Sequence, residues 1–285
     1  MEHAMFTIFK ECFPNLPINE EVFKKLIEDE RNHYIRKCEK DELIGYSIVK
    51  DNHIMLLCVI PSHQNKGIGK ELVKESEAFI KQNGFDTVVL GAMDSNLFLG
   101  AVIEEKDWEE KHHAFFESCG YHNTGNFVEM QMSLKDVNVE ELPVNLNPEN
   151  ITFGYCTDEE KSNLYEAVAQ VDEEWVQYFK GNGSFYVAKE ENEIIGFTAL
   201  SFDDITLQST GFNKVGNIGC VGVIPSKRKY GLGLTMVARS IAELKKHGVE
   251  IGYIHFTHLE SWYAKLGYRT FCRFWFGSKE LVIND

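Results

Sequence analysis

The sequence lacks the patterns that mark a disulfide-rich, metal-binding or membrane protein. Its seven cysteines are odd in number and form no Cys-x-x-Cys pair, which argues against a disulfide framework and against a zinc site. No apolar run approaches the roughly 20 residues that a membrane helix needs, and the first residues lack the charged and apolar regions of a signal peptide. We therefore expect a cytoplasmic protein that binds neither a membrane nor a metal.

Positive charge is also scarce. The chain has 29 Lys and Arg against 44 Asp and Glu, for a net charge of -15, whereas nucleic-acid binding needs a concentrated basic surface. A neutral or cationic small molecule is a better partner. The acidic segment 172–178 could attract an amine, although such segments are more often a solvated helix face. No pattern in the sequence specifies an oligomeric state.

Residues 220–233 carry a pattern typical of a strand that ends at a proline, a glycine loop and the start of a helix. Their sequence is Cys-Val-Gly-Val-Ile-Pro-Ser-Lys-Arg-Lys-Tyr-Gly-Leu-Gly. The apolar run predicts a strand, and Pro225 ends it because proline has no N–H for a sheet ladder. The glycines then lead into a helix with apolar residues at helical spacing. Free N–H groups and the positive end of the helix dipole suit a diphosphate at this point.

The same order occurs at residues 58–69, Cys-Val-Ile-Pro-Ser-His-Gln-Asn-Lys-Gly-Ile-Gly, where the proline and both glycines lie 164 residues before their counterparts. Two copies at this separation predict two related domains. Residues 136–150 carry two prolines and four asparagines without an amphipathic pattern. We therefore expect an N-terminal domain over residues 1–135, a linker over 136–150 and a C-terminal domain over 151–285.

Periodicity predicts a similar order of elements in both halves: a strand, one or two helices, three strands, a helix, a strand, a helix and a closing strand. The fold class is therefore α/β, with a mixed sheet and helices on both faces. The first strand is expected at residues 6–9 and a loop at residues 91–108. We expect Trp262 and Trp275 to pack in the core of the second half.

This order resembles the GNAT superfamily of acetyl-CoA-dependent N-acetyltransferases, and it does so twice. The most specific part is Val-x-Val-x-Pro-x-x-Arg-x-x-Gly-x-Gly, followed some 30 residues later by Trp262-Tyr-Ala-Lys-Leu-Gly-Tyr268. The tandem arrangement looks most like the mycothiol-synthase type, in which the C-terminal domain carries out acetyl transfer. The resemblance implies acetyl-CoA as co-substrate and an amine acceptor.

The resemblance also implies which residues bind the cofactor. The pantetheine arm would pair with backbone at Val221 and Val223 between two splayed strands, as an added strand would. A β-bulge at Gly222 would free an N–H for the oxyanion. The cofactor-binding residues expected in the second half are Val221, Gly222, Val223, Arg228, Lys229, Tyr230, Gly231, Leu232 and Gly233. Those possible in the first half are Leu57, Val59, Gln64, Asn65, Lys66, Gly67, Ile68 and Gly69.

Tyr263 stands at the position of the family's general acid, where a phenol could protonate the departing thiolate. The base is less defined, because Asn217 stands where two-domain relatives often have a carboxylate, and asparagine accepts no proton at neutral pH. The candidates are His255, His258 and Glu260, each acting directly or through water. A further alternative is that no residue serves and the amine loses its proton to water.

The first half departs further from the family pattern. Phe116 occupies the position of the acid, and phenylalanine has no proton to donate. The interval from the second loop glycine to the glycine that ends the last helix is 51 residues here and 34 in the second half. We expect a non-catalytic copy that either binds acetyl-CoA or only shapes the cleft.

Three hypotheses for the function follow. The first is an N-acetyltransferase that moves acetyl from acetyl-CoA to a primary amine of a small molecule, by direct attack in a ternary complex. The alternative is a non-catalytic acyl-CoA-binding module that acts as a sensor or scaffold. A Rossmann-type nucleotide site is disfavoured, because the loops lack the third glycine and an acidic residue about 20 residues later.

Overall fold

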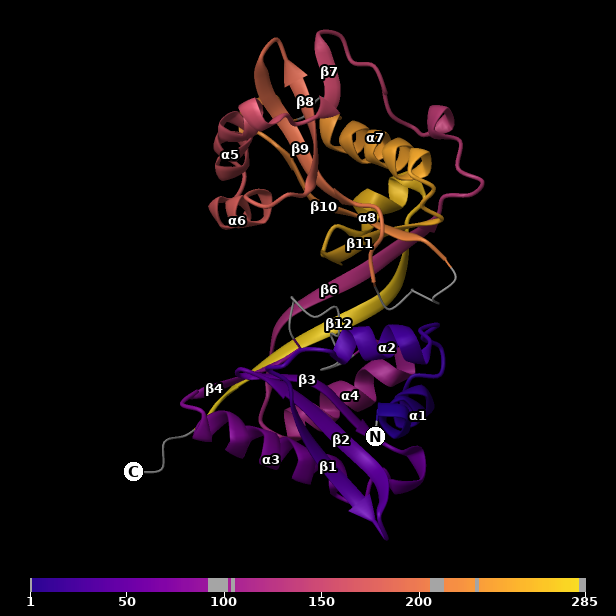
Figure 1. Cartoon of the computed structure of the whole chain (residues 1–285), viewed down its shortest axis with the longest axis vertical. Helices are drawn as coiled ribbons and strands as arrows, with labels where there is room; N and C mark the ends of the chain where they lie inside the picture. The colour runs from indigo at the N-terminus through magenta and orange to yellow at the C-terminus, as the bar shows by residue number, and fades with distance from the viewer. Residues whose placement is uncertain (1, 92–101, 104–105, 206–212, 229–230, 282–285) are drawn as a thin grey trace. The chain divides into compact units, whose positions relative to one another are not determined.

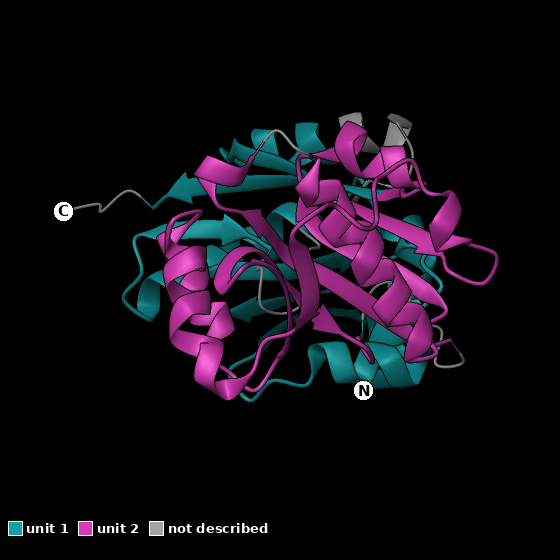
Figure 2. Ribbon diagram, turned by 90° about the horizontal axis from the view of Figure 1, so that it is seen from above, with its two compact units in different colours: residues 1–128, 205–212, 272–285 teal, residues 129–204, 213–271 magenta. Residues whose placement is uncertain are grey.

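The computed structural model describes all residues except 1, 92–101, 104–105, 206–212, 229–230 and 282–285. The chain divides into two compact units, of which unit 1 holds residues 1–128, 205–212 and 272–285, and unit 2 holds residues 129–204 and 213–271 (Figure 2). The units differ from the two sequence halves. The last strand of the chain lies mainly in unit 1, and the end of the first half's last strand lies in unit 2.

Unit 1 contains a sheet in the order β1-β2-β3-β4-β12, and Figure 1 labels its elements. The C-terminal strand β12 completes this sheet by pairing antiparallel with β4, where Ser278 is in register with Val89. Helices α1 and α3 pack on β2 and β3. The elements are α1 (Glu2–Cys12), α2 (Glu20–Ile27), β1 (His33–Glu39), β2 (Glu42–Lys50), β3 (His53–Val59), η1 (Pro61–His63), α3 (Ile68–Gln82), β4 (Thr87–Leu90), β5 (Val102–Ile103), α4 (Lys106–Ser118), β6 (His122–Ser133) and β12 (Arg269–Glu280).

The strand predicted near the beginning of the chain is a helix in the structure. Residues 6–9, expected as a strand, lie inside α1. Met5, Ile8 and Phe9 are its buried residues, and their spacing of three and four places them on one helical face. A four-residue apolar window does not distinguish a strand from one turn of a buried helix.

The predicted loop at 91–108 lies largely outside the described residues. Within the part that the structure describes, Val102–Ile103 forms the short strand β5, which pairs antiparallel with β12. Helix α4 begins at Lys106, two residues before the predicted end of the loop.

Unit 2 contains a sheet in the order β6-β11-β10-β9-β8-β7. Figure 1 shows α5 and α6 on one side of β8 and β9, with α7 on the other, which explains why β9 is buried almost throughout. Its elements are η2 (Val139–Glu141), β7 (Ile151–Tyr155), η3 (Asp158–Glu160), α5 (Lys161–Ala169), η4 (Glu173–Trp175), α6 (Val176–Phe179), β8 (Ser184–Glu190), β9 (Glu193–Ser201), β10 (Val215–Val223), η5 (Pro225–Lys227), α7 (Leu232–Lys246), β11 (Ile251–Thr257), α8 (Glu260–Tyr263) and η6 (Ala264–Leu266).

Because the last strand lies mainly in unit 1, one predicted core residue lies in a different core from the one expected. Trp275, expected in the core of the second half, is buried in unit 1 with Leu90, Phe116 and Tyr121. Its ring stacks on Phe116 with centroids 6.5 Å apart. Trp275 lies in this core because β12 pairs with a strand of the first half. No local pattern in residues 269–280 specifies that pairing.

The mixed α/β fold predicted from periodicity is confirmed: within each unit, helices pack on a sheet that contains both parallel and antiparallel pairs. Among the described helices, none is both long and apolar enough to cross a lipid bilayer.

Candidate active site in unit 2

Two neighbouring strands of unit 2 separate where the sequence predicted a cofactor arm. Strands β10 and β11 run parallel and are in register only at Val215 with Ile251, Gly216 with Gly252, and Asn217 with Tyr253. Beyond Asn217 and Tyr253 each strand continues without a registered partner in the other. Their facing backbone groups are therefore not used in a mutual ladder, and an extended ligand can pair with them.

The predicted bulge is present in β10, but it is formed by Cys220 and Val221, just before Gly222. The register between β10 and β9 shifts between Gly219 and Gly222, and Cys220 has a left-handed φ of 48°. Gly222 itself is in register with Phe197. A Cβ on Gly222 would lie 2.1 Å from the Phe197 ring, so this glycine makes room for a phenylalanine, and Cys220 and Val221 form the bulge.

A side chain closes the turn between β10 and the helix that follows it. Arg228 donates a hydrogen bond from Nε to the carbonyl oxygen of Val223, at 3.0 Å. The guanidinium therefore lies at the end of β10, one of the two strands that separate. Lys229 and Tyr230, which were predicted to bind the cofactor, lie outside the described residues.

The helix after this turn begins as the glycine pattern predicted. Gly231 precedes α7 with a φ of 75°, a conformation that glycine adopts without steric cost. Its carbonyl accepts the N–H of Thr235, the first bond of the helix, so the N–H groups of Leu232 and Gly233 have no acceptor within the helix. No atom of the described residues lies within 4 Å of a Cβ built on Gly231, which leaves space at the helix N-terminus for an anion.

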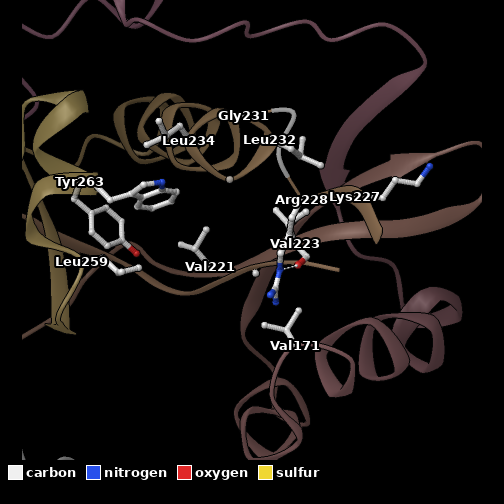
Figure 3. Close-up of a pocket in the computed structure, with 13 residues that line it drawn as sticks. Val171, Val221, Val223, Lys227, Arg228, Gly231, Leu232, Leu234, Leu259 and Tyr263 are labelled. Carbon is white, nitrogen blue, oxygen red and sulfur yellow. Dashed lines mark hydrogen bonds between the residues drawn. The ribbon is translucent and has the colours of Figure 1, made fainter. Parts of the chain in front are cut away.

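These elements border one pocket of about 420 Å³ (Figure 3). It combines the splayed strand, the glycine turn and the last helix of the domain, and its size fits a small-molecule site. The lining contains seven of the nine second-half residues predicted to bind cofactor, together with Tyr263. The lining residues are Val171, Val221, Gly222, Val223, Lys227, Arg228, Gly231, Leu232, Gly233, Leu234, Leu259, Trp262 and Tyr263.

Tyr263 is placed in this pocket by close packing between α8 and α7. A Cβ on Gly233 would lie 3.0 Å from the Trp262 ring, and the rings of Trp262 and Tyr263 are 4.7 Å apart in an edge-to-face arrangement. Burial, followed by the nearby Cys220 thiol, raises the pKa of Tyr263 to about 12. The phenol therefore keeps its proton at neutral pH, as a general acid must.

His255, a predicted candidate base, lies outside this lining and between two acidic side chains. Its Nδ1 is 2.9 Å from Oε2 of Glu129, and its Nε2 is 3.7 Å from Oδ2 of Asp204. Burial lowers its pKa, but the two carboxylates outweigh burial and raise the pKa to about 9. The ring is thus an imidazolium at neutral pH, which already carries the proton that a base would accept.

The other candidate bases also lie outside the described lining. His258 is exposed, and Glu260 accepts a hydrogen bond from the hydroxyl of Thr270. Asn217, which replaces the expected carboxylate, pairs with Tyr253 where the strands begin to separate. Its Oδ1 is buried and has no hydrogen-bond partner among the described residues.

Several residues around this site were not predicted from the sequence. Val171 and Leu259 line the pocket, but each lies in a segment without a motif. Glu129, which pairs with His255, lies in the last strand of the first half, 126 residues away along the chain. Only the pairing of β6 beside β11 brings this carboxylate to its place.

The first-half loop repeats the local geometry. Gln64 donates a hydrogen bond from Nε2 to the carbonyl oxygen of Val59, at 2.9 Å. Gly67 precedes α3 with a φ of 90°, and within the described part of the chain no atom lies within 4 Å of a Cβ built there. Gly69 packs against Phe115, 3.0 Å from a built Cβ. The second position of this aromatic pair is Phe116, which is buried in the core of unit 1.

The chain belongs to the acetyltransferase (GNAT) family. The family's model matches it twice, over residues 2–121 and again over residues 152–268. Both matched regions include a Gly-x-Gly loop and an aromatic helix end, so the tandem arrangement predicted from the repeat is confirmed. A search of curated proteins gave no match to the sequence.

Solved structures share the fold at low sequence identity. A GCN5-related glucosamine N-acetyltransferase region of a fungal multi-domain β-N-acetylglucosaminidase is 22% identical with a TM-score of 0.80, over 98% of this chain and 37% of that chain. A tandem GNAT protein from the clavulanic acid biosynthesis pathway is 14% identical with a TM-score of 0.69, over 100% and 96%. A GCN5-related N-acetyltransferase from Sphaerobacter thermophilus is 17% identical with a TM-score of 0.71, over 99% and 93%.

Proposed function

We propose that the protein is an acetyl-CoA-dependent N-acetyltransferase that transfers acetyl to a primary amine of a small molecule in a ternary complex, with unit 2 as the catalytic unit. The observation that carries the proposal is a single pocket lined both by the glycine turn before α7 and by the protonated Tyr263. The turn supplies an anion cradle and the phenol supplies a proton.

In this proposal the diphosphate of acetyl-CoA lies against the N–H groups of Leu232 and Gly233 at the start of α7. The pantetheine arm extends along β10 and pairs with backbone at Val221 and Val223, which line the pocket. The bulge at Cys220 and Val221 turns N–H groups out of the β9 ladder, where one can bind the carbonyl oxygen as it becomes an oxyanion.

The neutral amine attacks the thioester carbon, the C–S bond breaks, and Tyr263 gives its proton to the departing sulfur and is then reprotonated from water. None of the thirteen described lining residues is Asp, Glu or His. We therefore propose that the amine loses its proton to water and that His255, whose raised pKa keeps it protonated, is not the base. Cys220 is not a nucleophile in this scheme, since burial and then the Asp172 charge raise its pKa to about 11.

The acceptor is proposed as a small amine, and amino sugars come first among those to test. The reason is the glucosamine N-acetyltransferase region named above, although its 22% identity carries the fold and not the substrate. The first-half cradle at residues 64–69 is proposed as a second acetyl-CoA site without turnover, because Phe116 offers no proton.

The absence of a base from the described lining also favours the alternative of an acyl-CoA-binding module without turnover. Release of free thiol distinguishes the two functions. Purified protein is mixed with acetyl-CoA and a panel of amines that includes glucosamine, other amino sugars, polyamines and amino acids. Amine-dependent thiol release supports the transferase, whereas calorimetric binding of acetyl-CoA without release by any amine supports the binding module.

A further inference from the structure

Strands β10 and β11 each carry a residue in a strained backbone conformation in the segment where the two strands separate. Cys220 on β10 has a φ of 48°, and Phe256 on β11 has a φ of 46°. Each lies three residues beyond the last registered pair, Asn217 with Tyr253. A left-handed conformation is sterically unfavourable for a residue with a side chain and persists only where its surroundings hold it.

The Glu129 side chain contacts β11 at this strained position. It is only 2% exposed, and its Oε1 accepts the backbone N–H of Phe256 at 3.3 Å. Its Oε2 is 2.9 Å from Nδ1 of His255. One carboxylate therefore binds two consecutive residues of β11 from the neighbouring strand β6.

The charges around this contact make it stable at neutral pH. A buried carboxylate is costly unless a counter-charge pairs with it, and His255 supplies that charge. Its ring faces Glu129 on β6, Asp204 beyond β9 and the ring of Tyr253, whose centroid is 4.6 Å away. The two acidic groups raise the pKa of His255 despite its burial, so the protonated ring pairs with the same Glu129 side chain that accepts the Phe256 N–H.

We propose that Glu129 is a positioning residue, which fixes the left-handed backbone of β11 at Phe256 and thereby keeps β11 apart from β10 where acetyl-CoA enters. The inference rests on the proposed function, since it assigns a purpose to the cleft. Glu129 precedes the second half in sequence by more than 20 residues. A residue outside the second GNAT repeat would thus be needed for the site in that repeat.

The test is the affinity of the full chain for acetyl-CoA, measured by calorimetry on wild type, Glu129→Ala and Glu129→Gln. The alanine variant loses both contacts, and its Kd is expected to rise about tenfold, a change equal to about 1.4 kcal/mol. The glutamine variant keeps an oxygen for the Phe256 N–H and should lie between the two. Glu243→Gln is the matched control, because Glu243 is also buried in unit 2 but bonds Tyr155 and Lys246; its Kd should stay at the wild-type value.

A rescue variant separates positioning from general stability. Glycine adopts a φ near 46° without steric cost, so Phe256→Gly in the Glu129→Ala background should recover at least threefold in affinity. Binding by Glu129→Ala as tight as wild type overturns the inference, and so does a double variant no better than Glu129→Ala. If wild type itself binds no acetyl-CoA, the proposed function fails first, and that outcome is distinct from either of these.

Discussion

Arg228 donates a hydrogen bond from Nε to the carbonyl oxygen of Val223, five residues earlier in the chain. Gln64 makes the corresponding bond to Val59 in unit 1. The two side chains differ in charge and size but close the same turn between a strand and the glycine that precedes a helix. The Arg and Gln of the two loops are therefore equivalent as donors, which their sequences alone do not reveal.

This equivalence predicts different outcomes for two substitutions of Arg228. Arg228→Gln should retain the bond to Val223, as Gln64 does to Val59, whereas Arg228→Ala should lose about 1 kcal/mol from the free energy of unfolding. Urea denaturation of both variants measures the difference. Gln64→Ala is the control in unit 1 and should lose a similar amount. Equal stability of Arg228→Ala and wild type would show that the bond contributes nothing.

Tyr263→Phe should lower kcat at least a hundredfold with little change in KM for acetyl-CoA. The substitution removes the proton that Tyr263 donates to the leaving thiolate but keeps the packing of the ring. Steady-state kinetics with the best acceptor from the amine panel measures this. Tyr268→Phe is a matched control: its ring lies 6.1 Å from that of Tyr263, and its buried hydroxyl has no hydrogen-bond partner among the described residues. A Tyr263→Phe enzyme with the turnover of Tyr268→Phe would exclude the acid role.

Gly231→Ala should weaken acetyl-CoA binding about tenfold, since the new methyl group occupies the open space at the start of α7 and the positive φ adds strain of about 1 kcal/mol. Calorimetry measures the affinity for acetyl-CoA, and urea denaturation measures the loss of stability that the strain causes. Gly67→Ala places the same change at the N-terminus of α3, so it should cost similar stability while leaving turnover by unit 2 unchanged. Equal turnover in both variants would argue against a cofactor cradle at Gly231.

The His255 network predicts how stability depends on pH. The folded-state pKa of about 9 exceeds the unfolded value near 6.5, so the contribution of His255 is complete below pH 6.5 and is lost as the pH rises through 9. The change is of the order of 3 kcal/mol. Urea denaturation between pH 6 and pH 10 measures it. His255→Gln should flatten this part of the profile, and His258→Gln, at an exposed position, should leave it unchanged.

Much of the candidate site could be predicted because its signals are local. Pro225 and the two glycines fix a strand end and a helix start within a few residues, and Tyr263 follows in a compact aromatic and glycine pattern. The bulge at Cys220 could be placed only approximately, since Gly222 carried the visible signal while the backbone kink lies two residues earlier. The surroundings of His255 could not be predicted for a different reason: the carboxylates that raise its pKa come from two distant segments of the chain.

The sequence by itself determined the tandem repeat, the two glycine turns and the contrast between Phe116 and Tyr263, because each depends on residues close together in the chain. Only the tertiary structure decided which strands complete which sheet. It placed Trp275 in the core of unit 1 and Glu129 beside β11 of unit 2. The physical reason is that strand pairing depends on backbone groups, which every residue except proline presents alike, so a sequence marks where a strand lies more clearly than which partner it has.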